Sequence, residues 1–412
     1  MANILPFQPY RYTSKAGPLG NVVTQPYDKI TPEMRERYLE LSPYNLVRII
    51  LGKPAEPGAA ENVYQRAARH FREWIAEGIL ARDPEPGLYP YSQEFAMPET
   101  GEVLVRKGFI GLGPVEEYSK GVVYRHEQTL TGPKQDRLEL LRHTRAHFGQ
   151  IFMLYPDPAG EVDRILDESM RGAPIEEVRD EYLTIHRVWK ISEPARIEQI
   201  RGAMKDKRLL IADGHHRYET ALAFRNEHPE LESARSVMMT FVNMHSPGLR
   251  ILATHRVVRN LREFNPDAFL ARVREFFHVD RLDSLDALRR AWSEEHLDTI
   301  RIGVALRGGA LYLLEAPREP NVLDVRFLHE GVLGNLLGFG EADIREERHL
   351  TYVRGLEAAA DDVWRRDAQI AFLLEPVHIN EVARIAFSGG VMPQKSTDFY
   401  PKLLSGLTIY SL

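Results

Sequence analysis

The stretch Leu209–Phe224, LLIADGHHRYETALAF, contains an apolar run that ends abruptly at an acid, a glycine, two histidines and an arginine. The four apolar residues at 209–212 are typical of a short buried strand. Further along, Ala221 and Leu222 would lie on one face of a helix that starts near the histidines. The sequence therefore predicts a strand, a turn formed by ADGHHR, and then a helix.

This turn has the chemistry of an anion site. A helix N-terminus presents unpaired N–H groups and a partial positive charge, and Gly214 has no Cβ to keep a ligand away from the backbone. Arg217 opposes the helix dipole in the first turn, but it offers a forked donor for phosphate. We expect phosphate to bind at Gly214, His215, His216 and Arg217. The alternative is a structural turn in which Asp213 caps the helix and the histidines are solvated.

Composition narrows the classes of function. The chain has 412 residues, 43% of them hydrophobic, which suits a soluble globular protein of two or three domains. A net charge of -6 argues against a nucleic-acid partner. The absence of cysteine excludes disulfides, thiolate zinc sites and cysteine nucleophiles. Neither a signal peptide nor a run long enough to span a membrane is recognised, so a cytoplasmic location is expected. The oligomeric state is not predicted.

Helical and strand patterns alternate along the chain, which predicts an α+β fold. Helices are expected from Pro32, with Thr31 as N-cap, over 63–75, and from Ser192 with Pro194 onward. Residues 88–97 and 103–115 predict a hairpin across a PETGE turn, and further strands are predicted at 151–157, 182–189, 236–244, 250–258 and 368–375. The expected domains are a phosphate-binding domain over 1–258 and an α/β domain over 259–412, whose tail can pack back on the first.

Several segments carry a family resemblance that spans nearly the whole chain. They are VVTQPYD, SPYNLVRI, YRHEQTL with PKQDRLELL, ADGHHRYETAL, and MPQKSTDFYPKLLSGL. Together they resemble a prokaryotic family, the domain of unknown function numbered 1015, which is often labelled ParB-like. The resemblance implies an N-terminal domain of the ParB/sulfiredoxin type.

Within that superfamily, ADGHHRYETAL is similar to a strand-to-helix turn that surrounds nucleotide phosphates. Free serine kinases have a motif that reads much like Asp-Gly-His-x-Arg, which matches here at Asp213, Gly214, His215 and Arg217, with His216 in the variable position. The Gly-Glu-Arg-Arg of partition-type ParB proteins and a helix-turn-helix segment are both absent. The resemblance implies phosphate chemistry linked to ATP, ADP or CTP, and we expect ATP or ADP with Mg²⁺ as the cofactor.

Phosphoryl transfer needs cations and dipoles around the phosphates and a carboxylate that accepts the hydroxyl proton. The segment YRHEQTLTGPKQDR, read as a turn-rich region, supplies the charges. We expect Glu127 to be the general base, with Asp213 as the alternative and His215 as a further catalytic candidate. Possible contacts to substrate or phosphate are Arg125, His126, Lys134 and Arg137. YRHEQTL and ADGHHR should converge on one cleft; the alternative is a solvated charged loop.

Two further patterns bear on ligands. The tail segment MPQKST resembles the Lys-Ser/Thr pair of a P-loop but lacks its glycine spacing, so only a phosphate or carboxylate contact by Lys395 is expected. His215 and Glu219 are four apart and could chelate a metal, but HExxH spacing is absent and no dedicated protein metal site is expected. Magnesium brought in by the nucleotide fits better.

Three hypotheses follow from the sequence. The first is a nucleotide-dependent phosphotransferase that acts on a small hydroxylated metabolite such as serine, in the kinase direction or in reverse. The second is a nucleotide-gated, ParB-like binding or clamp protein without small-molecule turnover. The third is a metal-dependent hydrolase.

Overall fold

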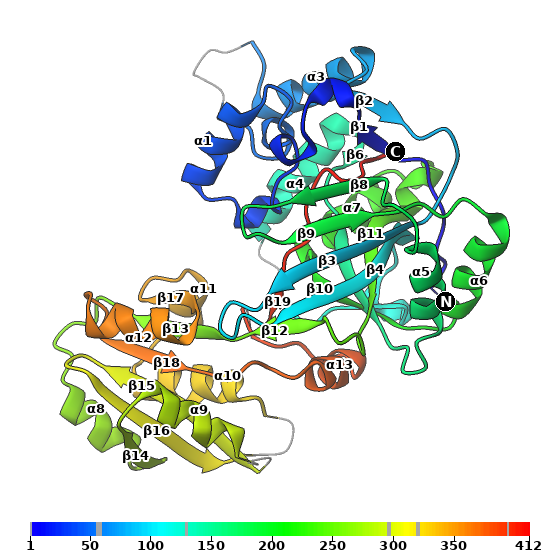
Figure 1. Ribbon diagram of the computed structural model, residues 1–412. Coiled ribbons are helices and arrows are strands. Elements are labelled where there is room, and N and C mark those ends of the chain that lie inside the picture. Colours follow the sequence, from blue (N-terminus) through cyan, green and yellow to red (C-terminus); the bar gives the residue numbers. More distant parts are fainter. Residues whose placement is uncertain (1, 55–59, 128–130, 295–297, 319–321, 394) are drawn as a thin grey trace. The chain divides into compact units, whose positions relative to one another are not determined.

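The computed structural model describes residues 2–54, 60–127, 131–294, 298–318, 322–393 and 395–412 (Figure 1). The chain forms two compact units. Unit 1 comprises Met1–Arg250, Ala386–Gly390 and Pro401–Leu412, and unit 2 comprises Ile251–Ile385 and Val391–Tyr400. Among the described residues, no helix combines the length and the apolar character needed to cross a membrane.

Unit 2 begins at Ile251, before the predicted boundary at 258, and the tail that was expected to be able to pack back on the first domain is part of unit 1. Strand β13 (Thr254–Val258), which sequence analysis placed in the first domain, pairs with two strands of unit 2, β17 (Leu350–Arg354) and β18 (Ile370–Leu373). The tail Pro401–Leu412 belongs to unit 1. Strand pairing over long sequence distances therefore decides the boundaries, which local composition does not reveal.

Unit 1 is built on an eight-stranded sheet with the order β5-β10-β7-β11-β4-β3-β9-β8. The strands are β3 (Tyr89–Ala96), β4 (Val103–Pro114), β5 (Val123–Tyr124), β7 (Ile151–Tyr155), β8 (Glu176–Arg179), β9 (Ile185–Val188), β10 (Leu209–Asp213) and β11 (Ser236–Asn243). Neighbours are antiparallel except the pairs β10–β5 and β11–β7, which are parallel. This mixed pairing gives an α+β architecture.

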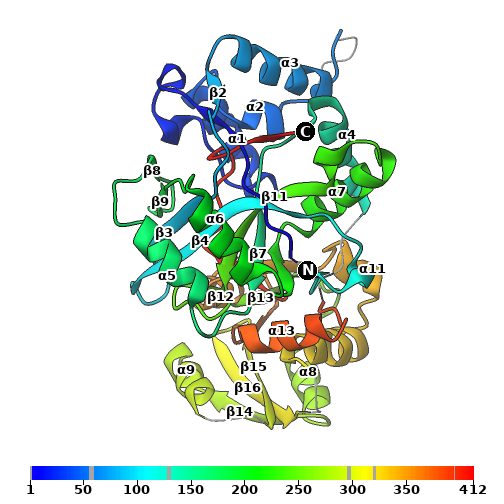
Figure 2. The ribbon, with the colours of Figure 1, turned by 90° about the vertical axis from the view of Figure 1, so that its right-hand side faces the viewer.

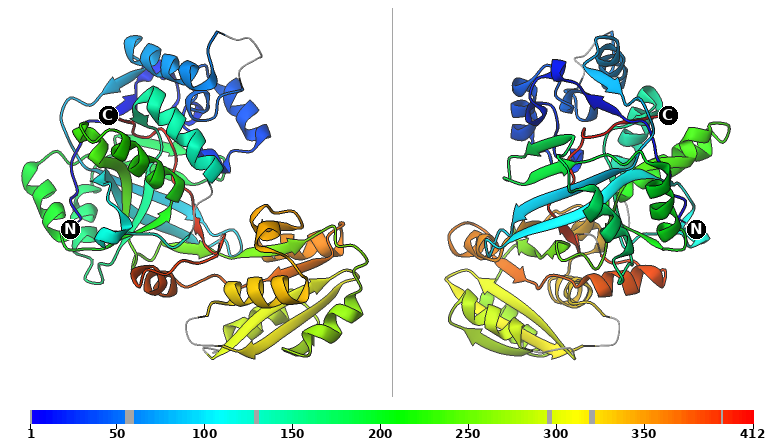
Figure 3. Two further views of the ribbon diagram at one scale, coloured as in Figure 1. Left: turned by 180° about the vertical axis from the view of Figure 1, so that it is seen from behind. Right: turned by 45° about the vertical axis from the view of Figure 1, so that its right-hand side comes forward.

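Helices α5 (Glu161–Ser169), α6 (Pro194–Met204) and α7 (His215–Glu227) contribute apolar residues to one core with the central strands. Figure 2 shows α5 and α6 beside each other, and Figure 3, from behind, shows the teal α4 (Thr131–Thr144) beside the green α7. Because α7 packs on both the sheet and α4, its N-terminus is held in place at the end of β10.

A second core in unit 1 gathers segments from both ends of the chain. Its residues come from the N-terminal region, from α4 and from the tail at Ile409. The elements of the N-terminal region are β1 (Tyr10–Tyr12), three short 3₁₀ helices (Ser14–Ala16, Leu19–Asn21 and Tyr27–Lys29), α1 (Pro32–Leu41), α2 (Val47–Ile50), α3 (Val63–Ala76) and β2 (Leu80–Arg82). The tail is tied in by β20 (Tyr410–Ser411), which pairs with β6 (Ala146–His147) beside the label C in Figure 1.

Local signals predicted several of these elements correctly. Helix α1 begins after Thr31, whose Oγ1 accepts a hydrogen bond from Met34 N at 3.2 Å. The hairpin β3–β4 and helix α3 are also confirmed. Helix α6 is preceded by Glu193 as N-cap, not by the expected Ser192, because the helix starts at Pro194 itself.

Unit 2 contains a six-stranded antiparallel sheet with the order β14-β16-β15-β18-β13-β17. Its other strands are β14 (His278–Leu282), β15 (Thr299–Leu306) and β16 (Ala310–Pro317), while β12 (Arg250–Leu252) pairs with β19 (Asp398–Tyr400). Helices α9 (Leu285–Ser293) and α12 (Leu356–Trp364) pack in one core with the sheet. Unit 2 also contains α8 (Pro266–Val273), α10 (Asp324–Phe327), a π-helix (Leu328–Leu336), α11 (Glu341–Arg345) and most of α13 (Ile379–Phe387). Two further 3₁₀ helices, Tyr118–Lys120 and Glu232–Arg235, belong to unit 1.

Candidate functional site

The predicted strand–turn–helix at 209–224 is present. Strand β10 ends at Asp213, Gly214 adopts a φ of 93°, and α7 begins at His215. A Cβ on Gly214 would lie 3.0 Å from Arg217 Nε, so both the backbone conformation and the space favour glycine. Asp213 Oδ1 accepts a hydrogen bond from Gly214 N at 2.8 Å, and no side chain caps α7. The alternative in which Asp213 caps the helix is therefore wrong.

Positive charges surround the Asp213 carboxylate. Its Oδ2 lies 3.5 Å from Lys402 Nζ and 3.9 Å from Arg217 Nη2. Burial acts to raise the pKa of Asp213, but the charges of Lys402, Arg217 and Lys29 outweigh it and hold this pKa well below its ordinary value. Asp213 is therefore ionised at neutral pH and is a weak proton acceptor.

Two histidines lie next to this turn. The rings of His126 and His215 are 4.7 Å apart at 73°. His126 Nδ1 is 2.8 Å from Ile211 O, and because a carbonyl oxygen only accepts, Nδ1 must donate. Burial lowers the pKa of both histidines, so His126 is neutral and its proton-accepting nitrogen is Nε2, 3.9 Å from Glu127 Oε1. Tyr124–Glu127 thus lie beside the ADGHHR turn, while residues 128–130 of the predicted segment lie outside the described residues.

Two residues that were predicted to contact phosphate, Arg125 and Lys134, form ion pairs with Glu219. Its side chain is 9% exposed and forms ion pairs with Arg125 at 3.4 Å and with Lys134 at 3.3 Å. Lys134 and Arg137 lie on α4 and not in the expected turn-rich region, because helix α4 already begins at Thr131. Each Glu219 oxygen faces a cation, so Glu219 does not form a metal-ligand pair with His215.

Arg217 also borders a cavity of about 60 Å³. It is lined by Tyr27, Ile50, Arg137, Leu140, Leu141, Ala146, His147, Phe148, Gly149, Arg217, Thr220, Val237 and Ser405. Arg217 Nη1 donates to Gln150 O, and the Arg137 guanidinium lies 4.3 Å from the centre of the Tyr27 ring. Two guanidinium groups among apolar walls suit a small molecule that carries a negative group.

Two candidates remain to be placed. His216 follows His215 on α7 and is half-buried. Lys395 belongs to unit 2, where its carbonyl accepts a hydrogen bond from Arg256 Nη2 at 3.1 Å. The tail residue beside Asp213 is instead Lys402, which the sequence analysis missed because the Lys-Ser-Thr pattern drew attention to Lys395.

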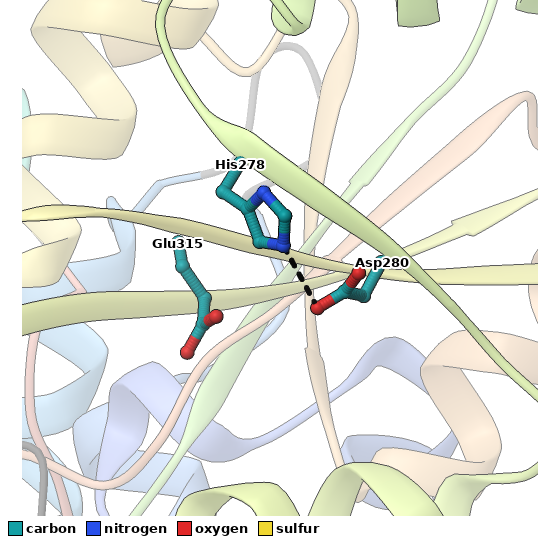
Figure 4. Close-up of side chains that lie close together, drawn as sticks. All are labelled: His278, Asp280 and Glu315. Carbon is teal, nitrogen blue, oxygen red and sulfur yellow. Dashed lines mark ion pairs between the residues drawn. The ribbon is translucent and has the colours of Figure 1, made fainter.

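In the part of the chain that the structure describes, one group of side chains has metal-ligand spacing, and it lies in unit 2. Figure 4 shows His278 and Asp280 from β14 beside Glu315 from β16. His278 and Asp280 are exposed, and Glu315 pairs with Arg301 at 2.7 Å. Because Arg301 competes for Glu315, this group carries no metal assignment.

Residues 4–334 match the model of a family described as a protein of unknown function, DUF1015. The chain belongs to the DUF1015 family. This confirms the family suggested by the quoted motifs. No curated protein matches the chain.

Among solved structures, a free serine kinase in complex with AMP is similar at 12% identity and a TM-score of 0.36, covering 69% of this DUF1015 chain and 88% of that chain. A conserved hypothetical protein from Pyrococcus furiosus is similar at 13% identity and a TM-score of 0.35, covering 69% and 92%. SbnI from Staphylococcus aureus, with a C-terminal truncation, is similar at 10% identity and a TM-score of 0.35, covering 72% and 87%. At such TM-scores the likeness carries no functional argument.

Proposed function

We propose that unit 1 catalyses nucleotide-dependent phosphoryl transfer to a small hydroxylated metabolite, or the reverse reaction, at the Asp213–Arg217 turn. The observation that carries this proposal is the convergence of cations, a helix N-terminus and two carboxylates on one turn. Lys402 and Arg217 contact Asp213, and Glu127 lies beside His126, which bonds to β10. Phosphoryl transfer depends on this kind of preorganised charge more than on covalent chemistry from the protein.

The phosphates of the nucleotide would lie at the N-terminus of α7. Gly214 allows close approach of the backbone, and Arg217 supplies a forked donor in the first helical turn. His216, half-buried on the same turn, is a further contact in this proposal. The carboxylate of Asp213 is the type of ligand that Mg²⁺ takes when it arrives with a nucleotide.

Glu127 is the proposed general base. In the forward direction the substrate hydroxyl oxygen bonds to the terminal phosphorus, the bond to the bridging oxygen breaks, and Glu127 receives the hydroxyl proton. Asp213 is less suitable as a base. Burial raises its pKa, but the charges of Lys402, Arg217 and Lys29 lower it by more, so the carboxylate holds a proton weakly.

The cavity beside Arg217 suggests the class of substrate. Arg137 at this cavity would pair with a carboxylate while Arg217 binds the phosphates, and the small volume of about 60 Å³ limits the size of the bound group. A hydroxylated amino acid such as free serine satisfies both conditions. A ParB/sulfiredoxin-like domain and a cytoplasmic location complete the proposal.

Thermal-shift titration with ATP, ADP, CTP, pyrophosphate and phosphoserine tests binding, because a ligand bound only by the folded state stabilises it. Mass spectrometry of a reaction with ATP, Mg²⁺ and serine then tests turnover. Stabilisation by a nucleotide together with formation of phosphoserine supports the kinase. Binding without any product over a panel of hydroxylated metabolites contradicts the enzyme and favours the nucleotide-gated clamp.

A further inference from the structure

Lys402 lies at the candidate site although it comes from the C-terminal tail. Its side chain is 10% exposed, with Nζ 3.5 Å from Asp213 Oδ2. It lies beyond residues 4–334, the region that the family model matches. Lysine side chains are usually solvated, so a lysine held this deeply needs a structural cause.

That cause is a clamp on the tail backbone formed by Gln93 and Arg106. Gln93 Nε2 donates to Lys402 O at 2.8 Å, and Arg106 Nη2 donates to Pro401 O. Arg106 Nε also donates to Gln93 Oε1 at 3.0 Å. Gln93 on β3 and Arg106 on β4 are register partners, so adjacent strands fix two consecutive carbonyl groups of the tail.

Both clamp residues are 1% exposed. The Arg106 guanidinium packs 4.6 Å from the centre of the Phe152 ring, and Phe152 is the register partner of Asp213 across β7 and β10. Burial lowers the pKa of Arg106 to about 10, so it keeps its charge at neutral pH. Burying a charge costs free energy, and here the buried guanidinium fixes the position of the tail relative to the strand that carries Asp213.

A buried hydrogen-bonded chain supports the clamp from behind. Tyr91 and His186 are joined by a hydrogen bond of 2.6 Å at His186 Nδ1, and His186 Nε2 lies 3.1 Å from Asp180 Oδ2. Gln93 Nε2 is 3.5 Å from His186 Nδ1. The amide of Gln93 is therefore oriented on one side by His186 and on the other by Lys402 O.

We infer that Lys402 is a phosphate-binding residue of the proposed site and that Gln93 and Arg106 are positioning residues that direct it there. The inference rests on the proposed function. Three cations act on the single Asp213 carboxylate, namely Lys402, Arg217 and Lys29. The clamp bonds to the tail backbone and not to the Lys402 ammonium, so the ammonium can exchange its contact with Asp213 for one with an arriving phosphate oxygen.

The first test compares ligand affinity in the full chain. Lys402→Met should weaken binding of ATP with Mg²⁺, and of pyrophosphate, by roughly tenfold to a hundredfold, the range for a lost bond to a charged group. Lys402→Arg should restore part of it. Lys190→Met is the matched control. The Lys190 side chain has a similar exposed fraction and its Nζ lies 3.4 Å from Asp83, but it follows β9, which is far from β10 in the strand order of the sheet.

The second test measures the clamp directly. Acetylation of Lys402, followed by mass spectrometry, should be slow in the wild type and several-fold faster in Gln93→Met, which cannot donate to Lys402 O. Lys190 in the same sample is the reference. If Gln93→Met does not fold, Arg106→Lys carries the measurement, because it keeps a charge but loses the donor geometry at Pro401 O.

The outcomes separate the two proposals. If Lys402→Met binds ATP and pyrophosphate as the wild type does, or if Lys402 labelling is unchanged in the clamp variant, the inference is overturned and the proposed function stands. If pyrophosphate binds through Lys402 while no nucleotide binds, the inference stands and the proposed function fails. If the wild type binds none of these ligands, both fail.

Discussion

Each unit contains an arginine that is 1% exposed and holds the C-terminal segment. Arg106 in unit 1 donates to Pro401 O, and Arg256 in unit 2 donates to Lys395 O at 3.1 Å. Each guanidinium also packs on an aromatic ring. Both arginines therefore have the same structural role. Each donates a hydrogen bond to a carbonyl group of an irregular segment, outside the helices and strands.

The surroundings of the two arginines differ. In unit 1 the anchored backbone continues into Lys402, which reaches the carboxylate of Asp213. In unit 2, Arg256 Nε lies 3.4 Å from His329 Nε2, and burial followed by the charge of Arg256 lowers the pKa of His329 to about 3. A buried arginine by itself thus indicates only that it anchors a backbone segment. A candidate site also requires that the anchored segment bring further charged side chains together, as Lys402 and Asp213 do in unit 1.

The largest expected effect concerns chemistry in unit 1 alone. Glu127→Gln keeps the side-chain shape but cannot accept a proton, so turnover should fall by about a hundredfold to ten-thousandfold with little change in nucleotide affinity. The control is Glu381→Gln, because Glu381 lines a separate cavity of about 500 Å³ in unit 2. Steady-state rates and thermal-shift titrations measure both. Wild-type turnover in Glu127→Gln would move the base to Asp213 or a histidine.

Replacing either buried arginine should destabilise its own unit. Arg106→Met and Arg256→Met each leave carbonyl groups without their donor, at a cost of about 3 kcal/mol for a broken buried polar network. Urea unfolding monitored by hydrogen exchange resolves the two units. Only Arg106→Met should also weaken nucleotide binding. Equal loss of binding in both variants would show that the two anchors do not differ in the proposed way.

The pH dependence of unit 2 should depend on His255. Its Nδ1 accepts a hydrogen bond from Leu374 N at 3.2 Å, and burial followed by Arg256 lowers its pKa to about 4. Below the unfolded-state pKa of about 6.5, His255 binds a proton in the unfolded chain but stays neutral in the folded one. The free energy of unfolding of unit 2 therefore falls as the pH drops toward 4. Between pH values of about 6.5 and 5, the loss is about 2 kcal/mol.

His255→Asn should reduce this dependence and leave the part that His329 contributes, since an amide oxygen can accept from Leu374 N but does not titrate in this range. Chemical unfolding of both proteins at several pH values, with hydrogen exchange of β18 amides as the probe for unit 2, measures it. An unchanged slope in His255→Asn would assign the acid sensitivity to other groups.

The smallest effect is on affinity at the turn. Arg217→Ala removes a charged donor, so nucleotide affinity should fall by roughly tenfold to a hundredfold, and stability should also fall because Gln150 O loses its donor. Arg318→Ala, at the unit 2 cavity, is the matched control. Isothermal titration with ADP measures both variants. If both bind as the wild type does, the turn at Gly214 is structural and the kinase proposal fails.

The sequence predicted those parts of the site that depend on neighbouring residues. The apolar run before Asp213, the glycine and the following helical pattern are local signals, and the structure has the expected strand, turn and helix. Convergence with His126 also followed from motif chemistry. The N-cap Glu193 was not predicted, because a serine and a proline nearby offered a stronger local pattern.

The clamp could not be predicted in the same way. Within VLVRKGFIG, Arg106 and Lys107 look alike as charges on a strand, yet Arg106 is 1% exposed because it donates to the tail carbonyl Pro401 O. That contact joins residues far apart in the sequence, so no periodicity records it. For the same reason Lys402 could not be distinguished from Lys395.

The division of the chain has a consequence for synthesis. Unit 1 includes Pro401–Leu412, and Ile409 from this segment packs in a core with the N-terminal region. A nascent chain therefore carries an open edge at β6 and an unfilled core until the ribosome has also made the residues of unit 2. At about 5 to 20 residues per second, that interval is roughly ten to thirty seconds. Unit 2 itself receives its last residues, Val391–Tyr400, directly before Pro401–Leu412, so both units are completed together at the end of synthesis.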